Sequence, residues 1–174
     1  FQPLVCPVVG EPHGDENPNA VDLVGDATHA PSYYAWDSSY LYFRFRVTGD
    51  PSGSKGFAQY SWVILLQVPS GDPFQHQFEL SLNGGGADDD FGNVGGQKGD
   101  TIEVWKNDPA ENVDFSPLFN DPSDARLFGQ RFDYAGPGTV NTSPIARIAL
   151  ATDGSSFGGN ADYFVDFAVP MSVL

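Results

Sequence analysis

The chain is poor in the residues that carry several common functions. It has one cysteine in 174 residues, Cys6, so an internal disulfide is excluded. Lys and Arg total 8 against 23 Asp and Glu, a formal net charge of −15. A surface of that sign repels nucleic acid, so we expect no nucleic-acid partner. No apolar run approaches the length of a membrane-spanning helix, so we also expect no membrane insertion.

Amphipathic helical periodicity is also lacking, whereas the chain holds 14 Phe, 7 Tyr, 20 Gly and 14 Pro. Aromatic residues favour strands, while Gly and Pro favour turns. A chain of this length can bury a core as one domain. The composition therefore predicts an all-β fold: an antiparallel jelly-roll-like β-sandwich of about nine to eleven strands, with long Gly/Asp/Pro-rich loops.

The clearest local signal is a hairpin. Residues 33–36 reach a turn at residues 37–39, and residues 40–47 then alternate between apolar and polar side chains. Strand side chains alternate between the two faces of a sheet. We therefore expect the core to receive Leu41, Phe43, Phe45 and Val47. The opposite face receives Tyr40, Tyr42, Arg44 and Arg46.

Further strands are predicted along the rest of the chain. Residues 62–66 are apolar on both faces, which indicates a central strand covered on both sides. Residues 83–100 and 107–122 are rich in Gly, Asn, Asp and Pro and are expected to form long loops. The predicted strands are residues 21–24, 59–68, 74–82, 101–106, 126–134, 144–150 and 163–169.

The first residues suggest an arm. Residues 1–10 are apolar but contain Pro3 and Pro7, which restricts them to an edge strand or an extended segment. We divide the chain into an arm and loop, residues 1–19, and a β-sandwich domain, residues 20–174. The arm can fold on its own domain or add a strand to the sheet edge of a second copy. The residues that would mediate such assembly are Leu4, Val5, Cys6, Val8 and Val9.

Residues 34–47, YAWDSSYLYFRFRV, resemble the aW-D-x-x-x-LY-x-x-x-x-V signature of the family 9 carbohydrate-binding modules and their DOMON-like relatives. Residues 163–172, YFVDFAVPMS, resemble the end of that family, where a strand runs into a proline. The resemblance implies a jelly-roll-like sandwich. Sugar-binding members clamp a saccharide between two tryptophans and often hold structural Ca²⁺. Haem-binding relatives use Met and His ligands, but Met171 lies in the terminal segment, which argues against haem here.

The resemblance supports the fold better than the function, because its motif consists of a turn and core residues. Trp36 lies in that motif, and we expect it in the core. A glycan platform would combine aromatic stacking with arginine hydrogen bonds. Its candidate residues are Tyr42, Arg44, Arg46, Trp62 and Trp105. The alternative, which we favour, is a solvated cross-strand charge ladder. That ladder would add Glu79, Glu103, Arg147 and Asp166 to the two arginines.

Acidic loops raise the possibility of structural Ca²⁺, because this ion takes clustered oxygen ligands. The main candidate site is Asp88, Asp89, Asp90 and Asn93. A second comprises Asp15, Glu16, Asn17 and Asp22. Solvated acidic turns are the alternative for both. No paired His or Cys spacing indicates zinc.

Catalysis has little support. His13, His29 and His76 have no nucleophile motif beside them. We therefore predict that the protein is not an enzyme; two carboxylates facing one another in a pocket would be the exception.

The functional prediction combines these points. Few lysines, loops of Asn, Gly and Ser, and a first residue other than Met suggest a processed protein located outside the cell or at the cell surface. We predict a non-catalytic module for glycan binding or cell-surface attachment. The alternative is a structural subunit of an extracellular fibre or surface layer, assembled by terminal strand exchange. The expected partner is a glycan or further copies of the chain.

Overall fold

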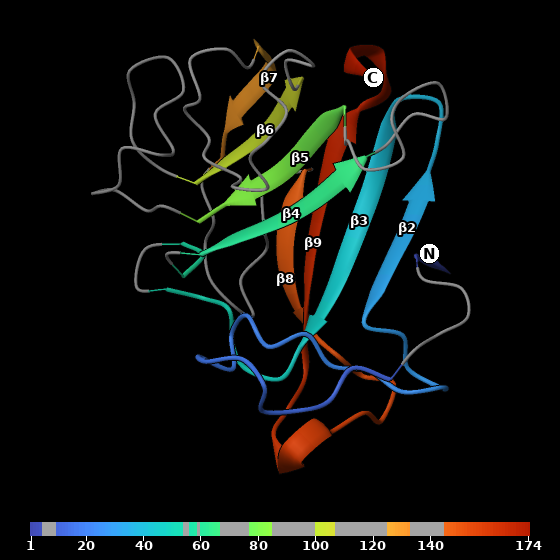
Figure 1. Cartoon of the computed structure of the whole chain (residues 1–174), viewed down its shortest axis with the longest axis vertical. Helices are drawn as coiled ribbons and strands as arrows, with labels where there is room; N and C mark the ends of the chain where they lie inside the picture. The colour runs from blue at the N-terminus through green and yellow to red at the C-terminus, as the bar shows by residue number, and fades with distance from the viewer. Residues whose placement is uncertain are drawn as a thin grey trace.

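The fold is built from two antiparallel β-sheets, seen here in a computed structural model (Figure 1). The structure describes residues 1–4, 10–53, 56–58, 60–66, 77–84, 100–106, 125–132 and 145–174. These contain nine strands and two short 3₁₀ helices, η1 (Phe157–Gly159) and η2 (Met171–Val173). The predicted antiparallel β-sandwich is confirmed. Within the described ranges, no helix has the length and apolar character that a membrane-spanning segment requires.

The first sheet contains the predicted hairpin, β2 (Ser32–Trp36) and β3 (Tyr40–Val47). β3 lies at its centre, because its other edge pairs along its full length with β9 (Tyr163–Pro170). β8 (Ala146–Leu150) pairs with the other edge of β9, and β1 (Gln2–Pro3) pairs with β2. The order is β1-β2-β3-β9-β8, so segments far apart in sequence form neighbouring strands.

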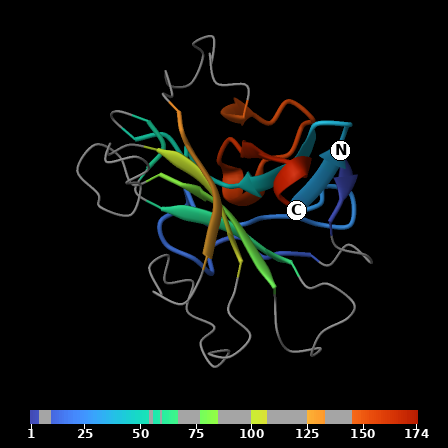
Figure 2. The ribbon, with the colours of Figure 1, turned by 90° about the horizontal axis from the view of Figure 1, so that it is seen from above.

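The second sheet is a meander of four strands in chain order. These strands are β4 (Ser61–Leu66), β5 (Phe78–Asn83), β6 (Thr101–Lys106) and β7 (Ala125–Arg131). Seen from above, it forms a layer beside the five-stranded sheet, away from β2 (Figure 2). Because of this offset, none of the described strands of the second sheet lies over β2 (Figure 2).

The core between the sheets follows the predicted alternation of β3. Phe43, Phe45 and Val47 are buried, and the Phe43 and Phe45 rings lie 5.4 and 6.1 Å from the ring of Phe167 on β9. The four-stranded sheet faces them with fully buried side chains. Burial of each large apolar side chain contributes about 1.5–3 kcal/mol to folding. The opposing side chains are Leu80, Leu82, Ile102 and Val104.

Two strand predictions were wrong in position or exposure. β4 is at the edge of its sheet and Leu65 is exposed, so this strand is not central and covered on both faces. Glu79 and Glu103 were expected on a solvated face, but both are buried. Glu103 accepts hydrogen bonds from Thr101 Oγ1 at 2.9 Å and Trp105 Nε1 at 2.8 Å. These donors replace water around its carboxylate.

The described part of the arm lies on its own chain. Gln2 and Pro3 pair with β2, and the Leu4 amide donates to the Ser32 carbonyl at 2.9 Å. The other proposed assembly residues, Val5, Cys6, Val8 and Val9, lie outside the described residues. The predicted strand at residues 21–24 is reduced to isolated bridges at Leu23 and Gly25. The division at residue 20 stays a prediction.

Loops gather at the end of the sandwich where β3 finishes. Residues 10–31 and η1 lie together there, at the lower end of the view (Figure 1). Gly158 in η1 has a φ of +60° and packs against the His13 imidazole, so a side chain at this position would collide with that ring. The predicted loops at residues 83–100 and 107–122 lie almost wholly outside the described residues.

Candidate functional site

The outer face of the five-stranded sheet carries an ion network at its centre. The Arg44 guanidinium binds both carboxylate oxygens of Asp166, at 2.7 and 2.8 Å. Arg147 Nε donates to the same carboxylate at 2.6 Å. Arg44 also lies between the rings of Phe1 and Phe164, 4.3 and 4.2 Å from their centroids. These contacts join three residues of the predicted charge ladder, but Asp166 is buried, so this part of the ladder is not solvated as expected. They also occupy Arg44, a candidate glycan-binding residue.

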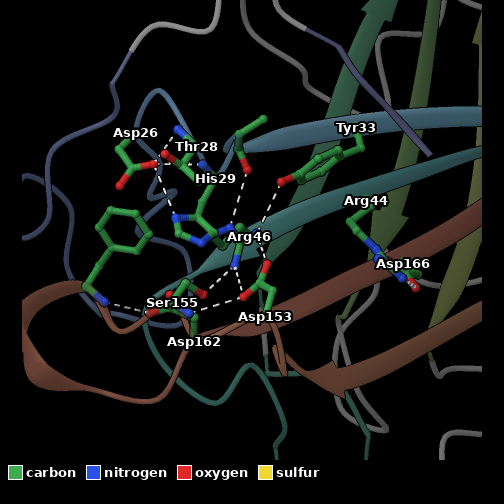
Figure 3. Close-up of polar contacts among 12 residues, drawn as sticks. Asp26, Thr28, His29, Tyr33, Arg44, Arg46, Asp153, Ser155, Asp162 and Asp166 are labelled. Atoms are coloured by element: carbon green, nitrogen blue, oxygen red, sulfur yellow. Dashed lines mark hydrogen bonds and ion pairs between the residues drawn. The ribbon is translucent and has the colours of Figure 1, made fainter.

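Arg46 is a structural residue, so its prediction as a glycan contact was wrong. Its side chain is fully buried and all three guanidinium nitrogens donate hydrogen bonds (Figure 3). Nη2 reaches Asp153 Oδ2 at 2.7 Å and the Tyr33 hydroxyl at 3.1 Å. Nη1 donates to Ser155 Oγ, and Nε to the Ala30 carbonyl. Arg46 thus ties the β8–β9 loop to the sheet and has no donor left for a ligand.

This pairing predicts acid sensitivity. Hydrogen bonding from Arg46, helped by Ser155, holds the pKa of Asp153 well below its usual value near 3.8. Folding therefore favours the ionised carboxylate. This contribution to stability is fully present above pH 3.8 and is lost progressively as the pH falls below that value. Urea unfolding from pH 6 to pH 2.5 should show wild-type stability falling below pH 4. Asp153→Asn should remove part of that fall; an equally steep fall in the variant would contradict this assignment.

An open depression lies next to the ion network on the same face. Its volume is about 630 Å³, and its base contains Ala35 on β2 and Ala168 on β9, which flank Tyr42 on β3 at one level of the sheet. The depression exists because two methyl groups stand where neighbouring rows carry larger side chains. Its lining also includes Phe1, Trp36, Asp37, Arg147 and Asp166.

Trp36 was also misplaced by the sequence prediction. It was expected in the core, yet its side chain is 58% exposed and stacks on Tyr34, with ring centroids 5.7 Å apart and planes 14° from parallel. Its place in the register puts it on the same side as Leu41. The described strands of the second sheet do not extend over β2, however, and Trp36 is accordingly exposed (Figure 2). Trp36 therefore borders the depression at the β2 edge of the sheet, not at its outer-face base, and it also lines a smaller hollow of about 200 Å³ at that edge.

Asp37 and Tyr42 form the polar rim of the depression. The Tyr42 hydroxyl donates to Asp37 Oδ2 at 2.7 Å, while Oδ1 accepts the amides of Ser39 and Tyr40. The hairpin turn thereby fixes the carboxylate, and the carboxylate orients the tyrosine ring. The hydrogen bond to Tyr42 lowers the pKa of Asp37, and the same bond raises the pKa of Tyr42.

A spectroscopic titration can test this orientation. Asp37→Asn removes the charge beside the Tyr42 hydroxyl, so we expect the pKa of Tyr42 to fall toward 10. Ultraviolet titration of the tyrosinates in wild type, Asp37→Asn and Tyr42→Phe identifies the affected group. The tyrosinate transition with the raised pKa, which we assign to Tyr42, should be missing in Tyr42→Phe. Identical titration curves for wild type and Asp37→Asn would contradict the contact.

The other two tryptophans do not join this site. Trp62 is 4% exposed and packs edge-on against Phe57 in the core, so its prediction as a ligand contact was wrong. Trp105 is half-buried on β6 in the other sheet, where its indole donates to Glu103 and lies beside Arg126. Of the predicted ligand residues, the depression contains Tyr42, with Arg44 in the adjoining ion network.

The predicted calcium site cannot be placed, because Asp88, Asp89, Asp90 and Asn93 lie outside the described residues. Across the described ranges, no group of three or more His, Cys, Asp or Glu side chains is arranged for a metal ion. The Asp15 and Glu16 side chains are exposed, whereas Asp22 is fully buried. Asp22 thus differs in burial from the acidic residues predicted with it.

Comparisons with protein-family models, with curated proteins and with solved structures found no match for the chain. The family resemblance therefore stays a prediction from residues 34–47 and 163–172. The function has to be argued from the site itself.

Proposed function

We propose that the protein is a non-catalytic binding module that takes a saccharide in the depression beside Trp36. The observation that carries the proposal is an open depression with a polar rim, bordered at the β2 edge of the sheet by Trp36, whose side chain is 58% exposed. Exposed tryptophan is costly on a surface without a partner and is concentrated at binding sites. A sugar ring offers C–H groups for stacking and hydroxyls for the polar rim.

The polar groups of the depression suit hydroxyl ligands. The Asp37 carboxylate has two fixed oxygens, and further lone pairs can accept from a sugar hydroxyl. The Arg147 side chain is 54% exposed and uses Nε for Asp166, so its terminal nitrogens can donate outward. The two carboxylates of the site are held by internal donors, Asp37 by Tyr42 and Asp166 by two arginines. That arrangement favours binding over proton transfer.

The test is a glycan screen followed by titration calorimetry with the best ligand. Trp36→Ala should weaken binding by about tenfold or more, since buried tryptophan contacts commonly dominate binding energy. Arg147→Ala should weaken it less. The control is Tyr60→Ala, which removes an exposed ring outside the depression and should bind like wild type. A wild type that binds no glycan, or equal affinity of Trp36→Ala and wild type, would refute the proposal.

The strand-exchange alternative is favoured by one separate observation. Among the described residues, the edge of β2 pairs with the two residues of β1, one of which is Pro3, and Phe1 and Leu4 are exposed. Such a short pairing can be displaced by a longer strand from a second copy. Light scattering of the chain with and without residues 1–9 decides the matter. A large particle that becomes monomeric on deletion supports a structural subunit, and a monomer in both forms refutes it.

A further inference from the structure

The ion network beside the depression holds two guanidinium groups against one carboxylate. Arg44 bonds both oxygens of Asp166, at 2.7 and 2.8 Å, and this bidentate pair already balances the carboxylate charge. Arg147 then adds a bond from Nε to Asp166 Oδ2 at 2.6 Å. The network therefore has a formal surplus of one positive charge, although the whole chain has a formal net charge of −15.

The two arginines differ in how much of each guanidinium is available to a ligand. The Arg44 side chain is 18% exposed and lies between two phenyl rings, turned onto Asp166 (Figure 3). The Arg147 side chain is 54% exposed and lines the depression. It bonds Asp166 through Nε, and its Nη1 and Nη2 have no hydrogen-bond partner among the described residues. Arg147 therefore has two unused donor atoms at the wall of the depression.

These two nitrogens are better suited to a carboxylate than to a hydroxyl. Nη1 and Nη2 of one guanidinium lie in one plane and carry parallel N–H groups, which match the two oxygens of a planar carboxylate. A single hydroxyl oxygen does not match both donors in this way. Because Arg44 alone balances Asp166, the charge of Arg147 is left to favour an anionic ligand group over a neutral one.

The surplus positive charge lies on one side of the depression. Among the described lining residues, Asp37 is the acid outside the ion network. It lies at the β2–β3 turn, whereas Arg147 is on β8, three strands away in the order β2-β3-β9-β8, or about 14 Å at the usual strand spacing. The Tyr42 hydroxyl and two backbone amides hold Asp37 as a fixed anion. Asp37 therefore repels an anionic ligand group and directs it toward Arg147.

We propose that the saccharide is an acidic one, a hexuronic acid whose carboxylate is bound by Nη1 and Nη2 of Arg147. This inference rests on the proposed function, since it names the chemical class of ligand for the same depression. The base that contains Ala35 and Ala168 would receive one face of the sugar ring, and hydroxyls remote from the carboxylate would reach Asp37.

The acidic surface of the chain is compatible with an anionic ligand. At 0.15 M salt, charges more than about 8 Å apart are largely screened from one another. The groups in direct contact with the ligand carboxylate therefore decide its affinity, and Arg147 is the nearest of them in this arrangement.

The test compares each acidic saccharide with its own methyl ester, which has nearly the same shape and no charge. The probes are trisaccharides of galacturonic, glucuronic and mannuronic acid, their methyl esters, and the neutral trisaccharides of galactose, glucose and mannose. Titration calorimetry of the full chain at pH 7 and moderate salt gives the affinity for each. At least one acid should bind about five- to tenfold more tightly than its ester, the gain expected for a half-exposed bidentate charge pair.

Variants of the chain assign this preference to Arg147. Arg147→Gln should bind the acid no more tightly than the ester, and it should fold because Asp166 keeps its bidentate pair with Arg44. Arg147→Lys keeps the charge without the planar fork and should retain part of the preference. The matched control Arg126→Gln removes a positive charge from β7 in the other sheet and should retain all of it. Trp36→Ala should weaken the acid and the ester equally.

The possible results distinguish a wrong ligand class from a wrong site. If wild type binds none of the acids, esters and neutral saccharides, both the proposed function and the acidic class are refuted. If an ester or a neutral saccharide binds wild type as tightly as every acid does, the depression takes a saccharide but the acidic class is wrong. The class is also wrong if Arg147→Gln keeps the preference, or if a sulfated galactose trisaccharide or an aspartate peptide binds more tightly than each uronic acid. The ligand comparison uses wild type alone, so it decides the class even where a variant does not fold.

Discussion

Trp62→Ala is expected to lower the free energy of unfolding by about 3–5 kcal/mol. The indole is 4% exposed and packs on Phe57, whose ring also contacts Phe132 at 5.8 Å. Truncation leaves a cavity between the sheets that rigid strands cannot close. Urea unfolding at pH 7 followed by circular dichroism measures the loss.

The matched variant for this site is Trp62→Phe. The Trp62 Nε1 group is buried and has no hydrogen-bond partner within the described residues, so replacing the indole by a phenyl ring removes an uncompensated donor. The loss should stay below about 1.5 kcal/mol. Trp36→Ala, at an exposed site, should change stability by about 0.5 kcal/mol or less. A small effect of Trp62→Ala with a large one of Trp36→Ala would reverse the assignment of the two tryptophans.

Asp153→Ala is expected to destabilise the protein by about 3 kcal/mol, because it leaves the buried Arg46 guanidinium without its carboxylate. We place the loss at the lower end of the range for broken buried pairs, since Asp153 is 39% exposed and water can reach the vacated position. Arg46 also lies 4.6 Å from the Phe164 ring, which holds it in place and limits its escape to solvent.

Two further variants separate the charge from the hydrogen bonds. Asp153→Asn keeps one oxygen acceptor and should lose about 1–2 kcal/mol. Glu16→Ala removes an exposed acid from the same end of the molecule and should be nearly neutral. Equal stability of wild type and Asp153→Ala would mean that Arg46 does not depend on this contact. Chemical denaturation at pH 7 in low and moderate salt provides the comparison.

The sequence predicted the local elements well where apolar and polar side chains alternated with a period of two residues. Alternation along residues 40–47 identified the strand, its core face and its outer face, because each side chain in a strand has one of two directions. The turn at Asp37 was visible for a similar reason, since its carboxylate bonds the amides two and three residues on. Thr101–Lys106 was predicted with the same bounds that the structure shows.

The candidate site was harder to predict, because exposure depends on which strands lie opposite. Trp36 and Trp62 both occur in apolar strand patterns, yet one is open to solvent and the other is in the core. The difference comes from the offset of the four-stranded sheet, which does not reach over β2 (Figure 2). Likewise, Arg44 and Arg46 are equivalent in the pattern, but only Arg46 meets the β8–β9 loop.

By itself, the sequence determined the β-class, the hairpin, the strand faces and the acidic surface, since these depend on neighbours along the chain and on composition. The tertiary structure alone decided which aromatic ring is exposed and which arginine is buried. Those facts depend on strand order and register, which join residues more than a hundred positions apart. Such pairings are set by packing of the two sheets and leave no local pattern in the sequence.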